Sequence, residues 1–308
     1  MDREIWANVM TAIHRACREL EYSGRTPRFP HWLVVAMYLW SVFHDRCLSW
    51  ACERDHYGAL FRPRKLPSIS QFTRRIKNAH CQKILAHVHE QLRVSGIASS
   101  TGYLDGKPLL VSPVSKDRDA RSGHIRGGFA KGYKLHAYVN DQRRICVWTV
   151  MPLNVAEQSV AMEMCDYLPA PAALEESLVM ADGNYDSHPL HRKLAESPAR
   201  APLLTPLKGQ NRVGENGHHP VTLRQMGPQR RELVSLWEQN PDLARYLLKS
   251  RNNIEGVFSV LCVAMGLSAT LPAWARGLAR VRRWVGAKII LYHARLLAQE
   301  HRAANVAA

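Results

Sequence analysis

The sequence lacks the patterns that mark secreted and membrane proteins. No apolar run approaches the ~18 residues that a membrane-spanning helix requires, and the first residues, MDREIWANVM, lack the basic-then-apolar order of a signal peptide. The seven cysteines form an odd set without a CxxC pair, so a disulfide framework is not expected. Repeats and low-complexity segments are also missing. These absences predict a soluble, cytoplasmic protein with no membrane partner.

Acidic residues are scarce at both ends of the chain. The 308 residues include 42 Lys/Arg against 26 Asp/Glu, which gives a net charge of +16. Residues 1–100 hold 15 basic against 8 acidic side chains and residues 201–308 hold 15 against 6, whereas residues 101–200 hold 12 of each. A strong positive field favours a polyanionic partner. We therefore expect the ends to grip nucleic acid; the alternative is a basic protein without a specific partner.

The first third of the chain has the pattern of a small all-α domain, expected over residues 1–97. Residues 32–43, WLVVAMYLWSVF, form an apolar stretch that is too short to span a bilayer and suits a buried helix. The stretch 47–57 then leads through the breaker-rich FRPRKLP to a second helix. Two helices around a tight connection predict a helix-turn-helix-like arrangement at 47–80, which would bind DNA.

The second of these helices has a polar face suited to phosphate groups. Ser68 and Gln71 have the spacing of a capping box, so the helix is expected to begin there. Phe72 and Ile76 lie four residues apart and are expected to face the core. The cations left for phosphates are Arg74, Arg75 and Lys77. The alternative is a solvated helix whose charges have no partner.

From about residue 100 the pattern changes to strands that alternate with helices. GYLDGKPLLVSP, GYKLHAYVN and RICVWTVM predict three successive strands, the last two forming a hairpin. The segment 115–132 is Gly-rich and charged, so we expect a mobile loop there. The later elements are expected to be a helix at 156–168, a strand at 177–187, a helix at 188–197, a strand at 201–208 and long helices from about 220. This order predicts an α/β protein with a mixed sheet flanked by helices.

Three short motifs in this part of the chain carry acidic residues. They are LDG at 104–106, ADGNYDS at 181–187 and RNNIEGVF at 251–258. Together with the hairpin stretch between the first two, GYKLHAYVNDQRRICVWTVMPLNVAEQ, they resemble the signatures of bacterial insertion-sequence DDE transposases. The resemblance covers about residues 100–295. It implies a ribonuclease H-like catalytic domain over 98–308, ending in a basic helix, with the protein in the bacterial cytoplasm at the nucleoid.

The resemblance also implies a catalytic triad of Asp105, Asp182 and Glu255. Asp105 would lie on the first strand and Asp182 at the end of the fourth, which are neighbours in ribonuclease H-like sheets. Phosphodiester cleavage needs an activated nucleophile and a stabilised leaving oxygen, and two cations can supply both. Carboxylates are the ligands that Mg²⁺ prefers, with Mn²⁺ as a substitute. The expected partners are double-stranded DNA, as terminal inverted repeats and target, and a second copy in a homodimer.

The surroundings of Glu255 match the family signature in part. Arg251 stands one helical turn before it, as in the family's Arg-x-x-x-Glu pattern, where it could bind a DNA phosphate or orient the carboxylate. Leu248 and Cys262 stand where the family has Tyr and Lys. Two alternatives therefore stay open: a metal-dependent nuclease without strand transfer, and a non-catalytic DNA-binding relic of a transposase.

Other polar clusters have simpler interpretations. Asp186 precedes His188-Pro189, where capping a helix is its commoner use. A loosely zinc-like spacing also fits an ordinary helix face with buried cysteines; its members are His44, Cys47, Cys52 and His56. Near the C-terminus an amphipathic helix carries a basic stripe with i, i+4, i+7 spacing, formed by Arg276, Arg280 and Arg283. This stripe is expected to contact DNA phosphates or to be a solvated face.

Overall fold

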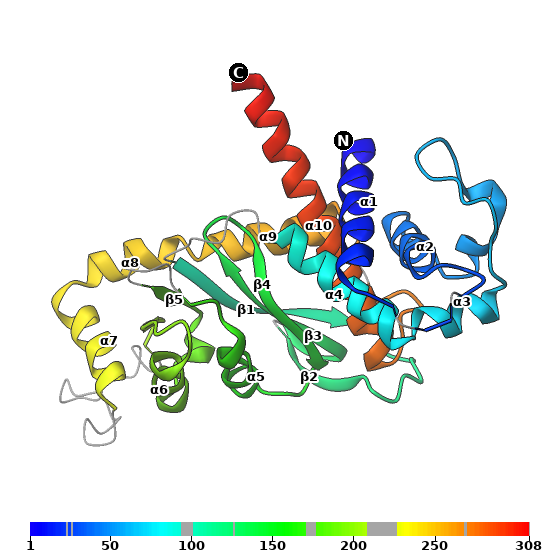
Figure 1. Ribbon diagram of the computed structural model, residues 1–308. Coiled ribbons are helices and arrows are strands. Elements are labelled where there is room, and N and C mark those ends of the chain that lie inside the picture. The colour runs from blue at the N-terminus through cyan, green and yellow to red at the C-terminus, as the bar shows by residue number, and fades with distance from the viewer. Residues whose placement is uncertain are drawn as a thin grey trace. The chain divides into compact units, whose positions relative to one another are not determined.

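The chain folds into two compact units (Figure 1). The computed structural model describes residues 1–22, 24–25, 27–93, 101–125, 127–170, 177–207, 227–267 and 270–307. We call the first unit the helical unit; it comprises Met1–Ser95, Val260–Ser268 and Pro272–Ala308. The second, which we call the sheet unit, comprises Gly96–Ser259 and Ala269–Leu271. None of the described helices is both long and apolar enough to cross a membrane.

The helical unit is built around α2 (His31–Phe43), the apolar stretch expected to be a buried helix. Its side chains are buried almost all round, from Leu33 to Val42, so its hydrophobicity reflects a core position. The helices packed around it have amphipathic patterns: α1 (Asp2–Glu19), α3 (Ile69–Ile76), α4 (Ala79–Arg93) and α10 (Leu278–Ala307). Ser68 caps α3 through the expected capping box with Gln71.

The division into units differs from the expected boundary, because α10 belongs with the N-terminal helices instead of the sheet. Its buried face packs on α1, α2 and α4. The buried Lys288 of α10 donates to the Val42 carbonyl over 3.0 Å and pairs with Asp45, while Asn8 of α1 donates to the Ala294 carbonyl over 3.1 Å. The sequence showed that α10 has an apolar side, but a hydrophobic period does not identify the partner of that side.

The prediction that residues 47–57 form the first helix of a helix-turn-helix is wrong. Residues 47–57 form two single 3₁₀ turns, Trp50–Cys52 and Arg54–His56, instead of an α-helix. Side-chain contacts hold these turns: the rings of Trp50 and His56 stack at 4.4 Å, and the Tyr57 hydroxyl donates to the Ala51 carbonyl over 2.6 Å. The Trp40 indole N–H of α2 also donates to the His56 carbonyl over 3.1 Å, and tertiary contacts of this kind override local helix propensity.

Within the described residues, the sheet unit contains the expected mixed sheet with six strands. The strands are β1 (Thr101–Leu110), β2 (Arg121–Ile125), β3 (Gly128–Asn140), β4 (Ile145–Pro152), β5 (Leu178–Met180) and β6 (Leu203–Leu204). Their order is β2-β3-β1-β5-β6, and β4 also pairs with β3. The β1–β3 and β3–β4 pairs are antiparallel, whereas β5 runs parallel to both β1 and β6. An α/β mixed sheet flanked by helices is confirmed.

Part of the segment expected to be a mobile loop is a strand. Residues 121–125 form β2, which pairs antiparallel with residues 128–132 of β3. The glycines that suggested a loop include Gly132, where a Cβ would collide with the Leu109 carbonyl oxygen of the neighbouring strand. Close approach of two backbones therefore explains the glycine at this position better than a need for mobility.

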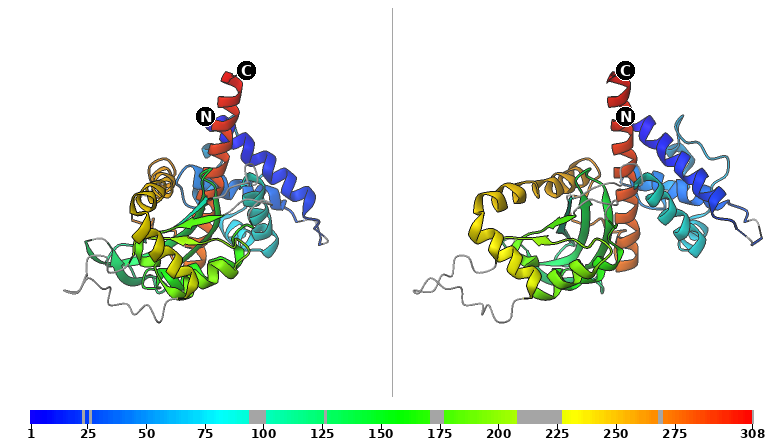
Figure 2. Two further views of the ribbon diagram at one scale, coloured as in Figure 1. Left: turned by 90° about the vertical axis from the view of Figure 1, so that its left-hand side faces the viewer. Right: turned by 60° about the vertical axis from the view of Figure 1, so that its left-hand side comes forward.

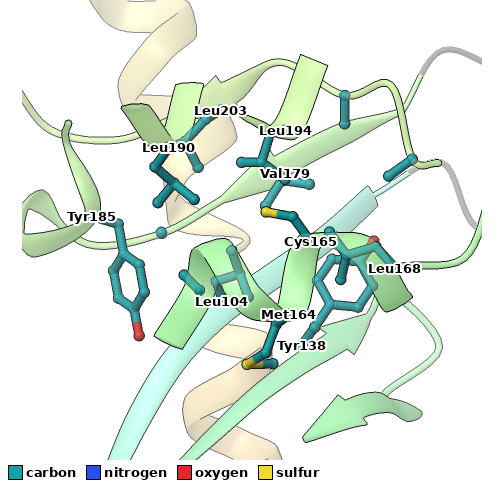
Figure 3. Close-up of a cluster of buried hydrophobic side chains, with 14 of the residues drawn as sticks. Leu104, Tyr138, Met164, Cys165, Leu168, Val179, Tyr185, Leu190, Leu194 and Leu203 are labelled. Atoms are coloured by element: carbon teal, nitrogen blue, oxygen red, sulfur yellow. The ribbon is translucent and has the colours of Figure 1, made fainter. Parts of the chain in front are cut away.

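Two helices, α5 (Glu157–Met164) and α6 (His188–Glu196), cover one face of the sheet (Figure 1). Figure 3 shows the apolar cluster that joins them to the strands, with Leu104, Val179 and Leu203 from the sheet against Met164 and Leu194. Because side chains alternate along a strand, the residues on either side of Leu104 point to the opposite face. Tyr103 and Asp105 are those residues.

The opposite face is approached by the chain that runs from α7 into α9. These helices are α7 (Pro228–Gln239), α8 (Pro241–Lys249) and α9 (Asn252–Val263). Asn253 of α9 donates to the Tyr103 hydroxyl over 3.1 Å, and the Ser250 hydroxyl donates to the Met180 sulfur over 3.3 Å. The start of α9 is thereby fixed beside the ends of β1 and β5.

Helices α7 and α6 lie side by side in the sheet unit (Figure 2), and a buried ion pair joins α7 to the residue Asp186 that precedes α6. Arg230 of α7 donates two hydrogen bonds of 2.7 Å to the carboxylate of Asp186, and both side chains are almost fully buried. His191 of α6 lies 3.4 Å from the same carboxylate. Asp186 is thus held by an arginine, which differs from the helix-capping role expected from the sequence.

Replacing Arg230 with Met should lower the free energy of unfolding by about 3–5 kcal/mol, because the Asp186 carboxylate would stay buried without its main partner. The double variant Arg230→Met/Asp186→Asn should lose less than the single variant. Urea denaturation measures both, with Arg192→Met on the exposed side of α6 as a control that should change stability by less than about 0.5 kcal/mol. Equal losses in the single and double variants would contradict the role given to this pair.

Candidate active site

The pairing of β1 with β5 brings two of the predicted catalytic carboxylates together. The two strands run parallel, with Tyr103 opposite Met180. Asp105 is two residues beyond Tyr103, and Asp182 is two residues beyond Met180 at the end of β5. Equal offsets from a paired position put both residues at the same level and on the same face of the sheet. The charge of Asp182 accordingly raises the pKa of Asp105.

Asp105 is held in an environment that disfavours its charged form. Burial is the main cause that raises its pKa from 3.8 to about 6, and the nearby charges of Asp182 and Glu157 raise it further. Two donors act in the opposite direction: the Gly106 N–H, which donates to Oδ1 over 2.7 Å, and the Arg251 guanidinium. These two donors therefore offset only part of the cost of burying the charged Asp105 carboxylate.

Asp182 also caps the 3₁₀ turn that follows β5. Its Oδ1 accepts the Asn184 N–H over 2.7 Å, at the start of the turn Gly183–Tyr185. This is the local role that an aspartate in a turn ordinarily has. The capping bond fixes one oxygen and so orients the carboxylate beside Asp105.

Glu255 approaches the pair from α9 and is tied to Arg251. The Arg251 Nη2 atom donates to Glu255 Oε1 over 2.7 Å, and its Nη1 atom lies 3.4 Å from Asp105 Oδ2. The Glu255 side chain is 56% exposed, whereas that of Asp105 is 18% exposed. One guanidinium therefore links the most exposed predicted ligand to the most buried one, which is the orienting role considered for Arg251.

Within the described residues no three His, Cys, Asp or Glu side chains are grouped closely enough to hold a metal ion. Asp105 and Asp182 nevertheless suit a hard divalent cation, since both offer carboxylate oxygens and their like charges repel. Glu255 is kept apart from them by its ion pair with Arg251. The donor set fits such a cation at the aspartates, and Glu255 is available only if that ion pair opens.

The sequence belongs to a family of known proteins. The family described as "Transposase DDE domain" matches residues 98–292, which is more than half of the chain. This chain is a member of the transposase DDE domain family. The match includes all three acidic motifs, so the resemblance inferred from them is confirmed at the level of the family.

Two solved structures are similar to this DDE transposase. One is the cryo-EM structure of a piggyBac transposase synaptic complex with hairpin DNA, with 9% identity, a TM-score of 0.49 and coverage of 98% of this chain and 73% of that one. The other is the Mos1 transposase paired-end complex with left transposon end, with 9% identity, a TM-score of 0.25 and coverage of 82% and 83%. No curated protein shows a significant match.

A second ion pair beside the carboxylates of the transposase was not predicted. Lys134 of β3 donates to Glu157 of α5 over 2.6 Å, and both side chains are largely buried. A Cβ on Gly106 would lie 2.8 Å from Lys134 Cδ and 2.9 Å from Glu157 Oε1, so a larger residue there would require these two side chains to shift. Both residues lie in the hairpin stretch that resembles the family, but nothing in their spacing marks them as close to Asp105.

The predicted DNA-binding cations differ in accessibility. Arg74 and Lys77 are exposed on α3, whereas Arg75 is half-buried and donates to the Phe29 carbonyl over 3.1 Å. Arg75 is therefore turned to the protein and does not lie open to a phosphate. Arg280 is exposed near the start of α10, and Arg276 and Arg283 are half-buried.

The zinc-like set makes local contacts. The Cys47 thiol bonds to the Ser49 hydroxyl at 2.9 Å, Cys52 donates to the Leu48 carbonyl, and His56 Nδ1 donates to the Trp50 carbonyl over 2.7 Å. Burial raises the pKa of Cys52 to about 11, which opposes formation of the thiolate that binds zinc. These contacts account for the residues as parts of the turns at 47–57.

Asp105→Asn should stabilise the metal-free protein at pH 8. The folded-state pKa of about 6 lies above the ordinary 3.8, so the charged carboxylate costs stability that appears above about pH 4 and is complete above pH 6. The gain should reach up to about 3 kcal/mol at pH 8 and be small at pH 4. Chemical denaturation in a chelator measures it, with exposed Asp141→Asn as control. If the variant is no more stable than wild type at pH 8, the raised pKa given to Asp105 is refuted.

Proposed function

We propose that this transposase cuts DNA at the ends of a mobile element and joins those ends to target DNA, with Asp105, Asp182 and Glu255 as ligands of divalent metal ions. The observation that carries the proposal is the position of Asp105 and Asp182, each two residues beyond the paired residues Tyr103 and Met180 of adjacent parallel strands, in a chain that belongs to the transposase DDE domain family. Mg²⁺ is the expected ion because it prefers carboxylate oxygens, and Mn²⁺ is the expected substitute.

The chemistry of DNA cleavage suits this arrangement of charges. When bound, two divalent ions supply a nucleophile at neutral pH and stabilise the leaving oxygen. Asp105 must lose its proton to act as a ligand, and its pKa of about 6 allows that near neutral pH. Arg251 contacts both Asp105 and Glu255, so a cationic side chain already lies between two of the three carboxylates.

The alternative functions are those of a nuclease that does not join DNA and of a DNA-binding transposase relic without catalytic activity. The relic is favoured by Leu248 and Cys262, which replace the Tyr and Lys of the family pattern; Cys262 is buried and cannot contact DNA in this conformation. Against it stands the raised pKa of Asp105, because a carboxylate that costs stability serves no structural purpose. Incubation with a labelled element end and target DNA separates the three, since only a transposase yields joined products.

Replacing Asp105, Asp182 or Glu255 singly with Ala should abolish cleavage and leave DNA affinity unchanged or slightly higher, because each change removes negative charge near the phosphates. Each removes several kcal/mol of transition-state stabilisation, which corresponds to more than about a hundredfold in rate. Single-turnover cleavage and gel-shift assays measure the two effects, and Asp141→Ala at an exposed turn is the control. A variant that cuts at near wild-type rate removes its residue from the triad.

Cleavage should proceed with Mg²⁺ or Mn²⁺ and stop with Ca²⁺, although all three ions bind carboxylate oxygens. Mg²⁺ requires near-octahedral coordination at ~2.0–2.1 Å, whereas Ca²⁺ accepts looser shells at ~2.3–2.6 Å and would misplace the reacting oxygens. Product formation in each ion, with DNA binding followed in parallel, tests this expectation. Full activity in excess chelator would show that the metal mechanism is wrong.

A further inference from the structure

The helical unit contains a pocket that the proposed chemistry does not use. Its volume is about 260 Å³, and it is lined by side chains from α2, the segment 46–49, α3 and the region 274–284 around the start of α10. Residues from widely separated parts of the sequence therefore meet in one place, all within this unit. We call it the Trp274 pocket after its most exposed aromatic residue.

The Trp274 pocket has a largely apolar and aromatic wall. Trp274 is 39% exposed, and Ile69 of α3 is 47% exposed, which is unusual for large apolar side chains. Trp284 is only 5% exposed, and within the described part of the chain its indole N–H has no hydrogen-bond acceptor. A buried donor without an acceptor is costly, so it indicates a missing partner. A flat apolar group that carries hydrogen-bond acceptors would pack against these side chains and could accept the Trp284 N–H.

The rim of the same pocket is positively charged. Among the described residues that line it, four are cationic and none is acidic; the four are Arg46, Lys77, Arg280 and Arg283. The nearest acidic residue in sequence, Asp45, is already paired with Lys288. A second, open hollow continues along α3 and adds Arg74 and Asn78. Charge complementarity therefore calls for an anionic ligand whose chain extends over α3.

We propose that the Trp274 pocket binds a single unstacked nucleotide of DNA, with its base against Trp274 and its phosphates on the cationic rim. This inference rests on the proposed function only in that the protein binds DNA. Aromatic side chains provide stacking surfaces for any base, and Arg and Lys bind the phosphates beside it. The volume lies below the ~300 Å³ at which pockets for drug-sized molecules begin, which suits one base and excludes a folded peptide.

The test compares two 30-base-pair duplexes that differ only by one unpaired, bulged adenine. The wild-type protein should bind the bulged duplex about tenfold more tightly, measured by fluorescence anisotropy in chelator so that no cleavage occurs. Trp274→Ala should remove this preference and leave affinity for the paired duplex unchanged, whereas Trp274→Phe should restore it. Arg280→Ala should weaken the preference; Lys65→Ala, an exposed cation of the same unit that does not line the pocket, should leave it intact.

Equal affinity of the wild-type protein for the two duplexes would overturn the proposal, and so would a preference that survives in Trp274→Ala. Free dAMP or inorganic phosphate should compete only weakly, and displacement of DNA by micromolar dAMP would instead assign the pocket to a free nucleotide. If the protein cleaves DNA but shows no preference for the bulged duplex, only the role of the Trp274 pocket is refuted. If it binds neither duplex, the proposed function is refuted as well.

Discussion

The candidate active site depends on the parallel pairing of β1 with β5. A hairpin and a helix separate Asp105 from Asp182 in the sequence. Without this strand pairing, nothing would bring the two residues together. With Tyr103 opposite Met180, the two aspartates emerge at one level and on one face. The apolar cluster on the other face, where Leu104 and Val179 contact α5 and α6, fixes that pairing because a shift by one residue would bury the carboxylates and expose the core.

The charge balance follows from the same pairing. The two neighbouring carboxylates repel each other, and the burial of Asp105 raises the cost of its charge further. The protein offsets part of this cost with Arg251, which contacts Asp105 and Glu255 at once. On the α5 side of β1, Lys134 pairs with Glu157 over Gly106. The remaining imbalance at the aspartates is the feature that a divalent cation would relieve.

Much of the fold and of the site could be predicted from local patterns. Strand alternation located β1, β3 and β4, and the capping box located the start of α3, because each is encoded within a few residues. The motif order singled out Asp105 and Asp182, which the β1–β5 register brings near each other. Contacts between segments could not be predicted: the Gly-rich stretch around β2 looked like a loop although β2 pairs with β3, and residues 47–57 form 3₁₀ turns that contact Trp40 of α2. For the same reason the sequence did not show that α10 groups with the N-terminal helices or that Arg75 donates to the Phe29 carbonyl.

The central claim is that Asp105 and Asp182 together form a site for a divalent cation. Electron paramagnetic resonance of Mn²⁺ titrated into the full-length protein at pH 7.5 tests it directly, without DNA or catalysis. The wild-type protein should bind Mn²⁺, and Asp105→Asn and Asp182→Asn should each weaken binding by more than about tenfold, while the exposed control Asp141→Asn leaves it unchanged. Equal Mn²⁺ affinity in the wild-type protein and both active-site variants would contradict the claim.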